Sequence, residues 1–233
     1  MKVAMLLSGR IKCYETCLIP LLQNAPYDVN IFASVNDNES DYYDEARKNL
    51  LPWMKELVVE PFAFSERFLE KFINIHGTRE PKPYNAMSMF FNQRKAYDMA
   101  VQYADNNLFE YDAYLKFRAD IHTHGLPQIT TTDEYKLFSA VAACDHNDPI
   151  LVREPLGFTE ERYRWICTEI AYGNRKSMKA YTDVYDFCME MIELFDGLYP
   201  CNFETSQLQT VYDRKMPVEF FNHFHHFNPS RHQ

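Results

Sequence analysis

Residues 116–124 read KFRADIHTH and include side chains that bind metal ions and phosphate. Arg118 can donate paired hydrogen bonds to phosphate, and Asp120 and His122 belong to types that ligate metals. Asp120 and His122 are two positions apart, so a strand would present both on one face, roughly 6.5 Å apart along it. If the strand ends there and the chain turns, both can approach one cation. A carboxylate with an imidazole suits Mn²⁺, and suits Mg²⁺ less well because Mg²⁺ favours oxygen ligands.

The same residues allow a purely structural interpretation, in which Arg118 forms a salt bridge with Asp120 and the histidines lie at the surface. A second histidine group, NHFHHF, stands near the C-terminal end of the sequence, where His223 and His225 would share one face of a strand. A mononuclear zinc site is the competing chemistry. Neither an H-E-x-x-H pattern nor a paired-cysteine pattern supports zinc.

The elements that must position these residues alternate between strand and helix. Apolar runs predict strands at residues 2–8, 27–35 and 56–62, and helices are predicted at 14–25 and 46–55, after an acidic loop at 36–45. A long helix at 84–104 precedes an alternating strand at 111–122. This order predicts a mostly parallel central sheet flanked by helices.

The second half of the chain is more mixed. Strands are predicted at 137–144, at about 159–172 and at 216–227, with a turn at Gly173 and helices after it and at 202–215. No repeat, linker or low-complexity segment interrupts the sequence. We therefore predict the α/β fold class and a single domain over residues 1–233.

Composition excludes some partners. The formal charge of -9 and the absence of long basic runs argue against nucleic-acid binding. No apolar run approaches the ~20 residues that a transmembrane helix needs, so we expect no transmembrane segment and a cytoplasmic location. The six cysteines form no C-x-x-C pair and are expected to be reduced thiols in the core.

Four motifs together resemble a known family. KVAMLLSGRIK, YNAMSMFFNQRKAYDMA, YDAYLKFRADI and EIAYGNRKSMKAYTDVYD occur in the order seen in small GT-A-type glycosyltransferases of bacterial surface polysaccharides and large DNA viruses. In such enzymes a D-x-D-type motif at the end of a strand binds Mn²⁺ and the diphosphate of a nucleotide-sugar. Asp120-Ile121-His122 is a D-x-H, which resembles the variant of some N-acetylgalactosaminyltransferases in which the histidine ligates the metal.

The resemblance implies a GT-A-like domain with Mn²⁺ (or Mg²⁺), a nucleoside-diphosphate-sugar donor and a glycan acceptor. Residues 1–125 would form the nucleotide-sugar-binding half and residues 126–233 the acceptor-binding half. The implied metal ligands are Asp120 and His122, with His223 or His225 as a late third ligand. The implied donor-binding residues are Ser8, Gly9, Arg10, Ser88, Asn92, Lys95 and Arg118. A solvated helix face is the alternative interpretation for Ser88, Asn92 and Lys95.

An inverting transfer needs a general base to deprotonate the acceptor hydroxyl. The resemblance points to the segment before AYG, where Glu169 stands one position from the usual acid, and Asp145 and Glu204 are alternatives. Helix capping or solvation would explain each equally well. A retaining enzyme would need no such base, and both stereochemistries remain open.

Three functions follow, in order of preference. The first is a metal-dependent glycosyltransferase that moves a hexosyl or pentosyl unit from a UDP- or GDP-sugar to a glycan or other hydroxyl acceptor. The second is a non-catalytic protein of the same fold that binds a nucleotide-sugar or a glycan. The third is a metal hydrolase that uses the histidine group.

Overall fold

The structure, a computed structural model, describes residues 1–9, 11–36, 40–63, 82–130, 133–141, 166–194, 203–223 and 225–227. The elements in its first half are β1 (Lys2–Ser8), α1 (Tyr14–Cys17), α2 (Ile19–Gln23), β2 (Asp28–Val35), α3 (Ser40–Asn49), β3 (Met54–Val59), α5 (Lys82–Asn106), β4 (Ala113–Phe117) and β5 (Ile121–Thr123). Those in its second half are β6 (Leu137–Val141), β7 (Ile166–Gly173), α6 (Arg175–Thr182), α7 (Val184–Leu194), α8 (Phe203–Asp213), β8 (Val218–Phe221) and β9 (His225–Phe227).

A seven-stranded sheet in the order β3-β2-β1-β4-β7-β6-β8 forms the centre of the molecule. β1 to β4 are parallel neighbours, β7 runs antiparallel to β4 and β6, and β8 is parallel to β6. Six strands therefore point the same way, which confirms the predicted mostly parallel sheet. Strands from both halves of the sequence share this one sheet.

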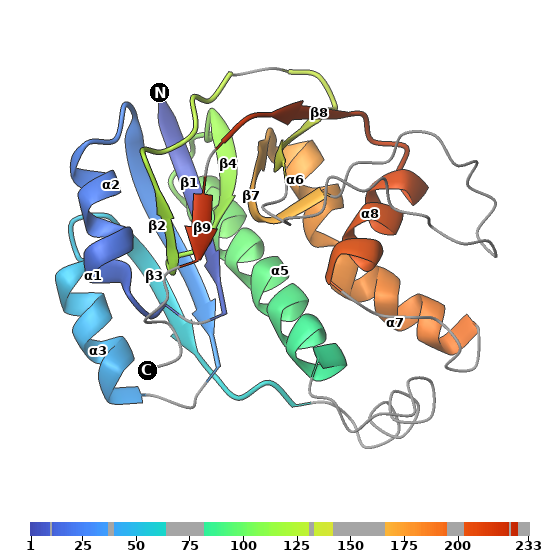
Figure 1. The fold of residues 1–233 in the computed structure, drawn as a ribbon, viewed down its shortest axis with the longest axis horizontal. Helices are drawn as coiled ribbons and strands as arrows, with labels where there is room; N and C mark the ends of the chain where they lie inside the picture. The colour runs from blue at the N-terminus through green and yellow to red at the C-terminus, as the bar shows by residue number, and fades with distance from the viewer. Residues whose placement is uncertain are drawn as a thin grey trace.

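Helices cover both faces of the sheet (Figure 1). One core lies between the sheet and α1, α2 and α3, and it includes Met5, Ile31 and Leu115. The core on the opposite face packs Leu6 and Tyr114 against α5, α6 and α8. Neighbouring residues of β1 and β4 thus enter different cores, as expected for central strands that are buried on both faces.

Two predicted helix boundaries were wrong. The helix predicted at residues 14–25 is two short helices separated at Leu18, because Pro20 lacks the N–H that a continuous helix would use. The segment predicted as an acidic loop forms α3 from Ser40, and the helix ends at Asn49 before the turn that contains Pro52. Acidic residues precede Arg47 and Lys48 in α3, which suits the helix dipole.

Two predicted strands are each divided in the structure. The strand predicted through residue 122 ends at Phe117, and a turn at residues 119–120 leads into β5. The strand predicted at residues 216–227 is divided into β8 and β9, and β9 pairs with β5 in a separate two-stranded ribbon. Each predicted strand passes from the main sheet into this ribbon, so alternation across the whole segment does not define one face.

Candidate functional site

The carboxyl ends of β1 and β4 flank the point at which the strand order reverses. From β1 the chain adds β2 and β3 on one side, and after α5 it returns to add β4 on the other side. Open α/β sheets bind ligands in the crevice outside the carboxyl ends of the strands at such a switch point. Ser8 and Gly9 end β1 here, and Arg118 follows β4 directly.

Arg118 and Asp120 are joined across the turn that ends β4. Arg118 Nε donates to Asp120 Oδ1 at 2.9 Å and Nη2 donates to Oδ2 at 2.7 Å. The Asp120 side chain is only 5% exposed, whereas that of Arg118 is 27% exposed. Burial opposes the charge on Arg118, but the bond to Asp120 outweighs it and raises the guanidinium pKa. The salt bridge that was the alternative interpretation is therefore present.

Lys116 lies beneath this pair and is fully buried. Its ammonium reaches one weak acceptor, Phe117 O at 3.5 Å. Burial, reinforced by the positive charge of Arg118, lowers the pKa of Lys116 to about 7. Lys116 was not among the predicted site residues. Its burial could have been predicted from the sequence, because a central strand of a helix-flanked sheet is covered on both faces, so a lysine within it must be buried.

Glu169 approaches the same end of β4 from β7. Ala171 lies opposite Lys116, which places Glu169 two residues farther along, towards Arg118. Its carboxylate accepts hydrogen bonds from Cys167 Sγ at 3.2 Å and Thr168 Oγ1 at 3.1 Å. Burial, with the charge of Glu169, raises the pKa of the Cys167 thiol well above its usual value. Glu169 is thus the candidate base that the structure brings to the switch point.

Ser8 and Gly9 end β1 with features that suit a close ligand. Gly9 has φ +82°, and a Cβ added to it would meet no heavy atom within 4 Å. Ser8 Oγ is buried and finds no hydrogen-bond partner in the part of the chain that the structure describes. Leu6 lies opposite Lys116, so Ser8 and Lys116 are diagonal neighbours on one face of the sheet. Both carry polar groups that the fold leaves largely unused.

Ser88 and Asn92 belong to a closed hydrogen-bond network instead. Ser34 Oγ donates to Asn92 Oδ1 at 2.7 Å, and Asn36 Nδ2 donates to Ser88 Oγ at 2.6 Å. Asn92 Nδ2 donates to Asn36 Oδ1 at 3.0 Å. This network ties α5 to the end of β2, and both α5 residues are buried, so neither lies on a solvated face. Lys95 forms an ion pair with Glu60, just past β3.

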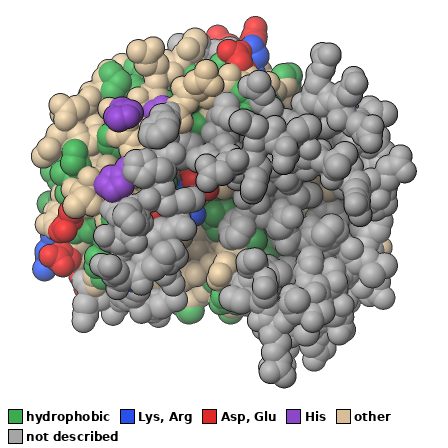
Figure 2. All heavy atoms as spheres, viewed as in Figure 1, with side chains coloured by type: hydrophobic (Ala, Val, Ile, Leu, Met, Phe, Trp, Pro, Cys, Tyr) green, Lys and Arg blue, Asp and Glu red, His purple; other side chains and the backbone are tan. Residues whose placement is uncertain are grey.

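The histidines lie in and beside the β5–β9 ribbon. His122 Nδ1 is 3.7 Å from Cys17 Sγ, and His223 Nε2 is 2.8 Å from Thr123 Oγ1. His223 lies between β8 and β9, so the prediction that it shares a strand face with His225 was wrong. Figure 2 shows histidine side chains at the surface of this face of the molecule.

Several predicted residues fall outside what the structure describes. Arg10 and Asp145 lie outside the described residues, and so do the side chains of Glu204, in α8, and His225, in β9. Within the described ranges, no group of three or more His, Cys, Asp or Glu residues is arranged to hold a metal ion. Among the predicted ligands whose side chains the structure describes, Asp120 lies at the switch point, and its carboxylate keeps lone pairs beyond the two that Arg118 uses.

Comparison of the sequence with models of protein families and with curated proteins found no match. No helix among the described residues is long and apolar enough to cross a membrane.

Proposed function

We propose that the protein is a GT-A-like glycosyltransferase that transfers a hexosyl or pentosyl unit from a UDP- or GDP-sugar to a glycan or other hydroxyl acceptor. The observation that carries the proposal is the Arg118–Asp120 pair directly after β4, beside Ser8 and Gly9 at the switch point. In the family that the sequence resembles, the D-x-D-type motif also follows a strand.

Each switch-point residue has a role in this proposal. Gly9 lets the backbone approach the donor, and Ser8 Oγ offers a hydrogen bond that the fold does not use. The Arg118 guanidinium stabilises negative charge on the diphosphate leaving group. In an inverting transfer, Glu169 would take the proton of the acceptor hydroxyl. Residues 1–125 would bind the donor and residues 126–233 the acceptor.

A divalent ion, Mn²⁺ or Mg²⁺, is part of the proposal, with Asp120 as its ligand and His122, His223 or His225 as the candidates to complete the set. When bound, it would act as a Lewis acid on the diphosphate oxygens. The described residues fit this group only in part, since Asp120 and Glu169 bring carboxylates to the switch point but no described group of three or more ligands is arranged to hold a metal ion.

The test is isothermal titration of UDP and GDP with and without Mn²⁺, followed by assays of donor hydrolysis and transfer. We expect nucleoside diphosphate to bind and Mn²⁺ to strengthen binding. An Asp120→Asn variant should lose the Mn²⁺ effect, whereas Asp213→Asn, a change on the exposed end of α8, should keep it. Absence of nucleoside diphosphate binding under all conditions would remove the proposal.

A non-catalytic protein that binds a nucleotide-sugar or glycan is the second candidate. It is favoured by the hydrogen bonds already made by both switch-point carboxylates, Asp120 to Arg118 and Glu169 to Cys167 and Thr168. Donor binding with no turnover of any donor sugar would select this candidate over the enzyme.

A further inference from the structure

A groove lies at the amino ends of β1, β2 and β3, at the edge of the sheet opposite the switch point. Its volume is about 730 Å³, within the range of about 300–1,000 Å³ typical of ligand pockets. β1 separates the two edges, and its length from Lys2 to Ser8 corresponds to roughly 20 Å at about 3.3 Å per residue. A ligand in this groove would not overlap one at the switch point.

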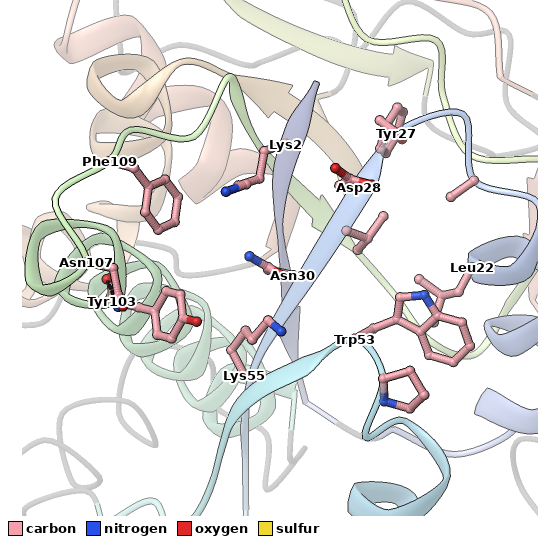
Figure 3. A pocket seen from close by; sticks show the side chains of 13 residues that line it. Lys2, Leu22, Tyr27, Asp28, Asn30, Trp53, Lys55, Tyr103, Asn107 and Phe109 are labelled. Atoms are coloured by element: carbon pink, nitrogen blue, oxygen red, sulfur yellow. Dashed lines mark hydrogen bonds between the residues drawn. The ribbon is translucent and has the colours of Figure 1, made fainter.

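Three adjacent strands and the end of α5 line one side of the groove. Lys2, Asn30 and Lys55 come from β1, β2 and β3, and Tyr103, Asn107 and Phe109 come from the end of α5 and the turn after it. Figure 3 shows the side-chain nitrogens of Lys2 and Asn30 on the same side of the strands as Phe109 and Tyr103. Trp53 lies on the other side of β2, beside Leu22 (Figure 3).

The groove is locally cationic within an acidic chain. Lys2 and Lys55 are exposed and outnumber Asp28, the one carboxylate among the lining residues. The Lys55 side chain has no hydrogen bond or ion pair with any residue that the structure describes. Acidic residues at the end of α5 and in the segment after it are already paired. Asp105 and Glu110 bind Arg175 at 2.7 and 3.3 Å, and Asp112 Oδ2 accepts a hydrogen bond from the Lys2 backbone N–H at 2.6 Å. Both ammonium groups thus remain available to an anion.

Aromatic and amide groups stand beside these lysines. Lys2 Nζ lies 4.4 Å from the centroid of the Phe109 ring, which itself packs edge-on against Tyr111 at 4.9 Å. Asn30 is held by a hydrogen bond to Tyr111 OH at 2.9 Å, and Asn107 by one to Tyr103 O at 2.8 Å. These rings and amides are fixed by the fold, so they would bind a ligand at little cost in conformational entropy.

We propose that this groove binds an anionic carbohydrate. A saccharide ring presents apolar C–H groups to an aromatic face and hydroxyls to amides, and its anionic group would pair with Lys2 and Lys55. The site is separate from the proposed donor site, so it would hold a glycan whether or not the protein transfers sugars.

Calorimetry of the full chain with three tetrasaccharides tests the proposal: a hyaluronan fragment, a heparin fragment, and neutral N-acetylchitotetraose. We expect one or both anionic probes to bind, and the neutral probe to bind at least tenfold more weakly. Lys55→Gln should weaken anionic binding about five- to tenfold, the size of one charge-assisted contact. Lys48→Gln, which removes an exposed lysine of α3, should leave it unchanged. Phe109→Leu should weaken binding of the saccharide but not of inorganic phosphate.

The opposite results would overturn the proposal. No binding of either anionic probe would do so, as would equal binding of the neutral probe or equal losses from Lys48→Gln and Lys55→Gln. Full displacement of the saccharide by inorganic phosphate at the same concentration would reduce the site to a general anion site. UDP binding measured on the same Lys55→Gln sample keeps the proposals apart, since the variant should bind UDP as the parent protein does.

Discussion

Replacement of Lys116 by methionine tests whether the fold buries this amine at an electrostatic cost. Burial lowers its pKa from the ordinary 10.5 to about 7. Between these values the unfolded chain holds a proton that the folded protein has released, so the Lys116 contribution to stability rises with pH. The full penalty applies well below pH 7, and the fall in pKa from 10.5 to about 7 then corresponds to about 5 kcal/mol.

Methionine has a similar volume and no charge, so the variant should lack this pH dependence. We expect Lys116→Met to be more stable than the parent at pH 7. Its advantage should shrink by roughly 1–2 kcal/mol between pH 7 and 8.5, since Lys116 is half protonated at pH 7 and neutral at pH 8.5. Tyrosines of the unfolded chain ionise above this window, and its cysteine thiols, which begin to ionise near pH 8.5, are the same in both proteins and cancel in the difference.

The assay is urea unfolding of both proteins at pH 7.0, 7.5, 8.0 and 8.5, with the difference in unfolding free energy plotted against pH. Lys48→Met is the matched control, because Lys48 is exposed on α3 and its replacement should give a flat difference. A flat difference for Lys116→Met as well would refute the reasoning, since it would show that Lys116 holds the same number of protons in both states.

Three further measurements have defined outcomes. Arg118→Ala leaves Asp120 buried without its partner and should lower the unfolding free energy by about 3–5 kcal/mol at pH 7, measured by urea unfolding. Part of this loss should be recovered at low pH, because Asp120 is then protonated. Gly173→Ala should cost about 1–3 kcal/mol, because the new Cβ would lie 2.9 Å from Ser177 Cβ and 3.1 Å from Lys136 O, whereas Gly125→Ala meets nothing within 4 Å. Burial raises the Tyr111 pKa to about 12, so its phenol should ionise late in an absorbance titration, and its contribution to stability should fall as pH rises from 10 to 12.

Each of these outcomes can fail separately. An Arg118→Ala protein as stable as the parent would show that Asp120 is solvated without its partner, and the Arg118→Ala/Asp120→Ala double variant should be less destabilised than the single one. Equal losses of unfolding free energy in Gly173→Ala and Gly125→Ala would contradict the steric explanation. A Tyr111 ionisation centred near pH 10, taken as the difference between the titrations of the parent and a Tyr111→Phe variant, would contradict burial of Tyr111.

The sheet was predictable because its signals are local. Short apolar runs separated by helical periodicity identify β1, β2 and β3, and their spacing favours parallel crossovers. The end of β4 was not predictable by the same means. Alternation continues through His122, but Arg118 binds Asp120 across a turn, and β5 finds its partner in β9, about 100 residues away in the sequence. The periodicity of neither segment predicts such a long-range pairing.

Residue type alone also could not separate structural polar groups from those available to a ligand. Ser8 and Ser88 look equivalent in the sequence, since each stands in a motif of the resembled family. Ser88 is part of a hydrogen-bond network with Asn36 and Asn92, so replacing it would lower the stability of the protein. Ser8 Oγ and Lys116 Nζ remain buried with no strong partner among the described residues, although the fold pays a desolvation cost for both. Tyr114 Oη and the side-chain oxygens of Gln93 and Gln207 are also buried without a hydrogen-bond partner among the described residues, so an unsatisfied group alone does not identify a ligand site. Ser8 and Lys116 differ from them in lying towards the carboxyl ends of β1 and β4, at the switch point of the strand order, where open α/β sheets bind ligands.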